Sequence, residues 1–263
     1  MSKSIFAILI LDSKYFGRGS SLMIGHDEQL AGVDGRLLQA VVENMKLPLL
    51  QVARQAELAR MSGSTDTNFS SIELTADTAL RLLDNYLLST RLASRRGSIE
   101  FEPVSVSAVL TDIAHQLSKL ADQQQCELQV NISGRYEPVI AHRAGLEAAL
   151  MSLGYVFIEA RSAQPVTSGK RIIRLGAHRG RSGIVAGIFT DSDSISNDMY
   201  KRAHSLYGHT RQSLPGLVAG SGAGVFVADS LLETMSTRLR VAHHQKFSGL
   251  AATLNPSKQL SLV

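Results

Sequence analysis

Apolar side chains recur every three or four positions along two stretches in the first half of the chain. In the first stretch they stand at Leu38, Val41, Val42, Met45, Leu49, Val52, Ala56 and Ala59, and in the second at Ile72, Ala76, Ala79, Leu83, Tyr86, Leu87 and Thr90. This spacing predicts two helices, and the polar residues 62–69 predict the turn that joins them into an antiparallel hairpin. Pro48 predicts a kink, because it removes a backbone donor while the apolar period continues beyond it.

The pattern changes after this hairpin, from long helices to a mixture of helices and strands. Residues 98–103 resemble a hinge; helices are expected at 105–124, 143–161 and 224–237, and strands at 127–132, 138–141, 171–178, 184–190, 239–243 and 250–254. A stretch rich in Gly, Ser and Asp lies between residues 191 and 221. This order predicts an α+β sandwich, with the helices packed on one face of the sheet.

Three segments follow from these patterns. Residues 1–34 form an N-terminal lead-in, residues 35–97 a helical hairpin, and residues 98–263 the α+β domain. Each face of the hairpin is apolar over its whole length, and a lone hairpin cannot bury such faces. We therefore expect two copies to pair as a four-helix bundle, which makes the protein a homodimer.

Composition excludes several classes of function. Hydrophobic residues make up 44% of the 263 positions, which excludes a disordered chain. A single cysteine, Cys126, excludes a disulfide framework and a cysteine-based zinc site. The absence of tryptophan argues against a stacking platform for single-stranded nucleic acid. The longest apolar run near the N-terminus, residues 5–11, is too short to span a bilayer, so we expect a cytoplasmic protein with no membrane partner.

The charge is divided unevenly along the chain. Residues 1–160 hold 14 Lys and Arg against 18 Asp and Glu, whereas residues 161–263 hold 13 against 5. Such a basic half is either a solvated surface or a site for a phosphate-bearing ligand. One group of cations that could contact phosphates is Arg171, Arg174, Arg179 and Arg181, although no DNA-reading helix accompanies them.

Two adjacent histidines lie on the predicted strand 239–243 or directly after it. His243 and His244 should point to opposite faces, so they cannot share a metal ion. Together with Gln245 and Lys246 they are expected to form a polar edge, and we expect no metal site.

Four short segments carry a resemblance to a known family. They are Glu43-Asn44-Met45-Lys46-Leu47-Pro48-Leu49, Ser152-Leu153-Gly154-Tyr155-Val156-Phe157, Asp191 after the strand 184–190, and Gly220-Ser221-Gly222-Ala223-Gly224-Val225. Their order and spacing resemble the core of bacterial sensor histidine kinases over residues 35–256. That core is a dimerising helical hairpin followed by an ATP-binding α/β sandwich of the type shared with gyrase and Hsp90.

The first segment differs from the family at the residue that performs the chemistry. The family has His-Glu-Leu-Arg-Thr-Pro-Leu here, and its histidine accepts the phosphoryl group. Glu43 stands at that position, and a carboxylate cannot replace imidazole as this nucleophile. The resemblance implies that Glu43, Lys46, Leu47 and Leu49 dock a partner, such as a response regulator or another kinase.

The nucleotide-binding segments are degenerate as well. The family's magnesium-binding asparagine corresponds to Val156, whose side chain offers no oxygen to a hard cation. Asp191 corresponds to the aspartate that binds adenine, but the glycines that follow it in the family are missing. Gly220, Gly222 and Gly224 match the glycines near the triphosphate, at a helix N-terminus that can receive an anion. We expect no cofactor beyond weak ATP binding at these four residues.

These differences predict a catalytically inactive histidine-kinase-like protein. It would act as a regulatory or scaffolding dimer in two-component-type signalling and dock a partner through the hairpin. Two alternatives remain open. The first is an ATP-binding ATPase or phosphotransfer protein with non-standard motifs, and the second is a basic nucleic-acid-binding regulator.

Overall fold

The computed structural model describes residues 49–52, 54–59, 61, 66–94, 99–162, 171–191, 200 and 222–257, with backbone alone at 66–71 and 222–223. The predicted lead-in and most of the predicted docking segment, including Glu43, Lys46 and Leu47, lie outside these ranges. The segment boundaries at residues 34 and 97 lie outside them too and stay predictions.

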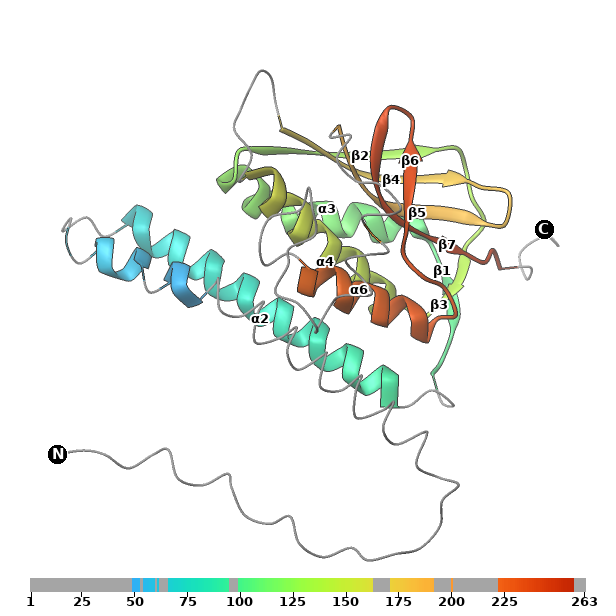
Figure 1. Ribbon diagram of the computed structural model, residues 1–263, viewed down its shortest axis with the longest axis horizontal. Helices are drawn as coiled ribbons and strands as arrows, with labels where there is room; N and C mark the ends of the chain where they lie inside the picture. Colours follow the sequence, from blue (N-terminus) through green and yellow to red (C-terminus); the bar gives the residue numbers. More distant parts are fainter. Residues whose placement is uncertain are drawn as a thin grey trace, which may run out of the picture. The chain divides into compact units, whose positions relative to one another are not determined.

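Two helical segments correspond to the predicted hairpin. Residues 49–52, 54–59 and 61 are helical, and α2 runs from Asp66 to Ser94. The side chain of Thr75 donates to Oε1 of Gln55 at 3.4 Å, so the two segments lie side by side (Figure 1). α2 begins inside the stretch predicted as a turn, because apolar periodicity marks only the residues of a helix that are buried.

The rest of the described chain alternates helices and strands. In order these are β1 (Glu102–Val104), α3 (Val106–Gln123), β2 (Cys126–Ser133), β3 (Val139–Ala141), α4 (Arg143–Ser162), β4 (Arg171–Arg179), β5 (Ile184–Thr190), α6 (Gly222–Thr234), β6 (Arg240–His244) and β7 (Phe247–Leu254). Each predicted helix and strand is present, with ends that differ by a few residues. The expected hinge contains β1, which pairs antiparallel with β3. The sequence around residues 102–104 did not predict a strand, because its partner β3 lies more than 30 residues further along the chain.

The strands form a five-stranded sheet in the order β2-β4-β5-β7-β6. β2 and β4 are parallel, and the other neighbours are antiparallel. Alternate residues of β4, β5 and β7 point to one face and are buried there, namely Ile173, Leu175, Ala177, Ile184, Ala186, Ile188, Leu250, Ala252 and Leu254. α3 and α4 pack on this face and α6 packs against α4, which confirms the predicted α+β class (Figure 1).

α4 is the central helix of the domain, and its buried residues lie on every side. They are Gly145, Leu146, Ala148–Ile158 and Ala160. A helix that is apolar all round needs neighbours on all sides. α4 finds them in the sheet, α3, α6 and α2. Among the helices of the described ranges, none combines the length and apolarity that a membrane span requires.

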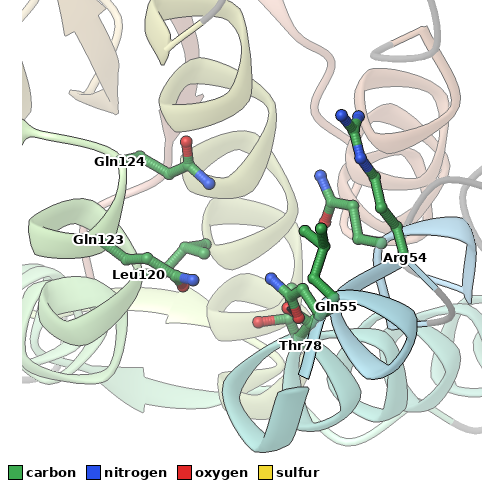
Figure 2. A pocket seen from close by; sticks show the side chains of 9 residues that line it. Arg54, Gln55, Thr78, Leu120, Gln123 and Gln124 are labelled. Atoms are coloured by element: carbon green, nitrogen blue, oxygen red, sulfur yellow. Dashed lines mark hydrogen bonds between the residues drawn. The ribbon is translucent and has the colours of Figure 1, made fainter. Parts of the chain in front are cut away.

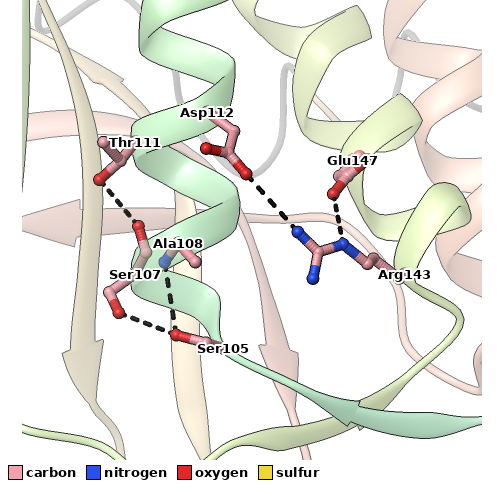
Figure 3. A network of polar contacts seen from close by, with 7 residues as sticks. All are labelled: Ser105, Ser107, Ala108, Thr111, Asp112, Arg143 and Glu147. Atoms are coloured by element: carbon pink, nitrogen blue, oxygen red, sulfur yellow. Dashed lines mark hydrogen bonds and ion pairs between the residues drawn. The ribbon is translucent and has the colours of Figure 1, made fainter.

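A polar network fixes the start of α3 and connects it to α4 (Figure 3). Ser105 is the N-cap residue, and its Oγ accepts a hydrogen bond from the backbone N–H of Ala108 at 3.4 Å. Arg143, at the first turn of α4, forms an ion pair with Asp112 of α3 at 3.5 Å and with Glu147 at 2.9 Å. The capping residue thus starts α3 directly after β1.

The variant Ser105→Ala tests this cap. It removes the acceptor for a backbone N–H of the first turn, so we expect the free energy of unfolding to fall by about 1 kcal/mol. Urea unfolding followed by circular dichroism measures the change. Ser105→Asp is the matched control, since aspartate is an equally good N-cap and should keep the wild-type stability; equal stability of all three proteins would contradict the assignment.

Candidate functional site

The structure brings together three of the elements predicted to form the nucleotide site: α4, the end of β5 and the start of α6. Val156 of α4 is 3% exposed and faces Gly224 in the first turn of α6. A Cβ atom on Gly224 would lie 2.5 Å from Cγ2 of Val156 and 3.4 Å from the carbonyl oxygen of Ser152. Gly224 is therefore required by the close approach of the two helices, and the valine side chain lies against its backbone.

Asp191 lies at the end of β5, where the resemblance places the adenine-binding aspartate. Its Oδ1 forms an ion pair with Nη2 of Arg161 at 2.9 Å and accepts a hydrogen bond from the hydroxyl of Thr190 at 3.2 Å. Arg161 belongs to the last turn of α4, and most of its side chain is buried. An adenine amino group at this position would share the carboxylate with a guanidinium.

α4 carries two further titratable side chains near Val156. Burial raises the pKa of the Glu159 carboxyl. Burial also raises the pKa of Tyr155 to about 12; Arg81 opposes this rise and Asp77 adds to it. Within the described ranges, no three side chains of His, Cys, Asp or Glu come together as a metal site. At the position of the family's magnesium ligand, the structure thus has the aliphatic side chain of Val156, buried against Gly224.

α2 lies against α4 and α6 through small and polar side chains. Asn85 Nδ2 donates to the hydroxyl oxygen of Ser152 at 3.2 Å, and Ser89 donates to Ser230 of α6 at 3.2 Å. Farther along α2, Leu92 approaches Gly145 so closely that a Cβ atom there would lie 3.2 Å from Cδ1 of Leu92. The face of α4 next to α2 is thus covered by protein atoms.

A cavity of about 300 Å³ lies between the helical segment 49–61, α2 and α3. Figure 2 shows the amides of Gln55, Gln123 and Gln124 and the guanidinium of Arg54 around it. Leu58 and Leu120 supply apolar surface. No motif of the sequence indicated this cavity, because its lining comes from three separate helices.

The remaining predicted site residues are only partly described. Gly222 begins α6, and Gly220 lies outside the described residues. Leu49, the one described member of the predicted docking set, has 57% of its surface exposed.

The four arginines noted in the second half do not form one surface. Arg171 donates to the carbonyl of Gln124 at 3.3 Å, and Arg174 donates to Gln129 and Gln245. Arg179 and Arg181 are exposed near the turn after β4. The cluster that the sequence indicated is thus divided between structural and exposed positions.

β6 is an edge strand of the sheet, and His243, Gln245 and Lys246 are exposed there as expected of a polar edge, but His244 is only 2% exposed. The β6–β7 hairpin places this side chain over Gly176 of β4, which is not a neighbour of β6 in the sheet. Alternation along a strand predicts the face of a residue, but it does not predict what covers that face.

The solved structures to which this chain is similar include histidine kinases. The histidine kinase AdeS of Acinetobacter baumannii superimposes with a TM-score of 0.51 at 12% identity, over 81% of this chain and 96% of AdeS. The histidine kinase ThkA, in its complex with the response regulator TrrA, gives 0.53 at 10% identity, over 88% and 64%. Full-length ShkA in complex with AMPPNP gives 0.50 at 16% identity, over 88% and 46%.

The described chain has a histidine-kinase-like core. This confirms the resemblance and the fold inferred from the four short segments. No family model matches the chain, and no curated protein matches it by sequence. At these identities the likeness concerns the fold alone, so the chemistry of this histidine-kinase-like core has to be argued from its own residues.

A double-mutant cycle tests the contact between Val156 and Gly224. Gly224→Ala alone should lower the free energy of unfolding by about 1–3 kcal/mol, because the new methyl overlaps Val156. In the Val156→Ala background the same change should be neutral or stabilising, since the space is open and alanine is favoured over glycine within a helix by about 1 kcal/mol.

Chemical denaturation of the four proteins measures the coupling. A cost of Gly224→Ala that is the same in both backgrounds would mean that the two side chains do not meet in solution.

Proposed function

We propose that this protein is a catalytically inactive histidine-kinase-like protein that acts as a regulatory or scaffolding dimer in two-component-type signalling. The observation that carries the proposal is the contact between Val156 and Gly224. Val156 stands at the position of the family's metal ligand, and its Cγ2 methyl packs against the backbone of α6 at Gly224. The glycines of this motif are kept, while the group expected to hold the cation is replaced by an aliphatic side chain.

Two other positions support the loss of phosphotransfer. Glu43 stands where the phosphoaccepting histidine is expected. The carboxylate of Asp191 is held by Arg161 at 2.9 Å. Acceptor, cation ligand and adenine contact are thus altered together, whereas a change in one of them alone would leave a nucleotide-binding protein.

The hairpin is the surface that we assign to partner docking. Leu49 is exposed and belongs to the same helical segment as Gln51, Arg54 and Gln55, which line the cavity. Among the described residues that line the cavity, Arg54 is the only charged one. These groups suit a protein partner that offers an apolar side chain and an acidic group. A response regulator is the partner class we propose, by analogy with the ThkA–TrrA complex.

Exposed leucines on α2 support a dimer. Leu80 and Leu87 are 59% and 45% exposed, and their spacing of seven residues places them on one face of the helix. Thr75, Ala79, Ser89 and Leu92 are buried on α2. Leu50, Leu58 and Met61 add exposed apolar surface on the neighbouring helical segment. A second copy that pairs with these faces would bury them as a four-helix bundle.

Thermal unfolding with magnesium and ATP tests the inactive site. A nucleotide with a Kd of about 10 µM would stabilise the fold by about 2.7 kcal/mol at about 1 mM and raise Tm by several degrees. We expect no shift for the wild type. Incubation with labelled ATP should likewise yield neither hydrolysis nor labelled protein. Saturable binding or turnover would overturn the proposal in favour of the ATPase alternative.

Sedimentation equilibrium of full-length variants tests the dimer. The wild type should show twice the chain mass of 28.4 kDa. Leu80→Glu combined with Leu87→Glu should reduce it to a single chain mass, because two charges would be buried at the interface. Lys246→Glu, a charge reversal at an exposed position in the β6–β7 turn and outside the hairpin of residues 35–97, is the control and should remain dimeric. A wild type that sediments as one chain would rule out the dimer while leaving the inactive site untouched.

A further inference from the structure

The face of the sheet that is turned away from α3 and α4 carries a buried polar cluster. It is built where the end of the β6–β7 hairpin lies over β4 and β2. His244, at the end of β6, reaches across the sheet to Gly176 of β4, where a Cβ atom would lie 2.9 Å from its ring. Only glycine leaves room at this point for the imidazole.

Ring contacts hold the hairpin end in place. The His244 ring lies 5.2 Å from the ring of His178 on β4 and 5.2 Å from that of Phe189 on β5. The guanidinium of Arg174 lies 3.7 Å from the centre of the Phe247 ring at the start of β7. The hairpin is thus attached to β4 at two places, once through His244 and once through Phe247.

A chain of hydrogen bonds determines where the protons of this cluster are. Arg174 only donates, so the oxygen of Gln245 faces it at 2.8 Å, and the amide nitrogen of Gln245 donates to Oδ1 of Asn131 at 3.3 Å. Nε2 of His244, 2.8 Å from the same oxygen, must therefore carry a hydrogen.

The tautomers of both histidines follow from this assignment. A neutral imidazole has one N–H, so Nδ1 of His244 is an acceptor. Nδ1 of His178, 3.0 Å away, is then the donor. With both rings neutral, the hydrogen bonds of the cluster therefore run in one direction, starting from the permanently charged Arg174.

The groups that face the pair disfavour an added proton. Burial, His178 and Arg174 lower the pKa of His244, and burial lowers the pKa of His178. On β2 the nearest acid, Glu127, accepts a hydrogen bond from Gln129, while β5 and β7 present the rings of Phe189 and Phe247. His243 points to the other face, where it contacts Ser248, and Lys246 is exposed in the turn.

We propose that His178 and His244 form a proton-operated latch, which holds the end of the β6–β7 hairpin, residues 244–247, over the open face of the sheet while both rings are neutral and releases this end when they are protonated. One added proton charges a buried ring beside Arg174. A second leaves two N–H groups facing each other across 3.0 Å. Release uncovers Phe189, Phe247 and the polar side chains of β2.

The lowered pKa values of His178 and His244 determine how the stability of the closed arrangement changes with pH. The open hairpin takes up protons at the ordinary histidine pKa of about 6.5, whereas the closed hairpin does so only at lower pH. The stability of the closed arrangement is therefore complete above about pH 6.5 and decreases as the pH falls below it. At about pH 5.5, one pH unit below the ordinary histidine pKa, the fraction of molecules with an open hairpin is about tenfold higher for each histidine that stays unprotonated in the closed state.

Hydrogen exchange of the full-length protein tests the latch. Amides at the hairpin end, residues 243–248, should exchange about tenfold to a hundredfold faster at about pH 5.5 than at about pH 7.5, after correction for the intrinsic pH dependence of exchange. Amides of α4 should keep their protection. A change of less than about twofold at the hairpin, or a parallel loss of protection in α4, would overturn the proposal.

Asn131→Asp makes the test specific to the pair. A carboxylate that accepts from Nε2 of His244 favours the charged ring, so the acceleration should shrink to less than about threefold. His243→Gln is the matched control, because it removes the neighbouring histidine on the opposite face, and it should retain the wild-type response. An undiminished response in Asn131→Asp, or a lost response in His243→Gln, would show that another group controls the opening.

Discussion

Burial of α4 on all its sides is the constraint on which the rest of the described structure depends. Its apolar residues must be covered by the sheet and α3 on one side and by α6 and α2 on the others. The small residues Gly145, Ala148 and Ser152 allow α2 to lie close, and Gly224 allows α6 to lie close. The relation between the hairpin and the α+β domain therefore follows from the packing of one helix.

This packing also accounts for the contacts that Val156 and Asp191 make. Where an asparagine would have to turn its oxygen toward a cation, Val156 adds a methyl to the contact between α4 and α6. The ion pair between Arg161 and Asp191 holds the end of α4 to the end of β5 in the same way. Val156 and Asp191 thus join α4 to α6 and to β5, and these two contacts are the basis of the scaffold function that we propose.

The two faces of the sheet differ in how much the sequence reveals about them. On the inner face, alternation along β4 and β5 predicts the buried residues, because each strand contributes alternate positions to one core. On the outer face, the sequence predicted that His244 belongs to a polar edge and gave no role to His178. The hairpin end covers them, and the fixed hydrogen-bond chain from Arg174 depends on residues of three strands. Contacts of this kind cannot be predicted from the alternation of polar and apolar residues along one strand.

The sequence by itself determined the helices, the strands and the α+β class, because these depend on local periodicity and on the chemistry of single side chains. The tertiary structure alone decided that Val156 touches Gly224, that Asp191 is paired with Arg161, that β1 pairs with β3, and that the hairpin covers His244. Each of these contacts joins residues far apart in the chain, and their distance is set by how whole elements pack.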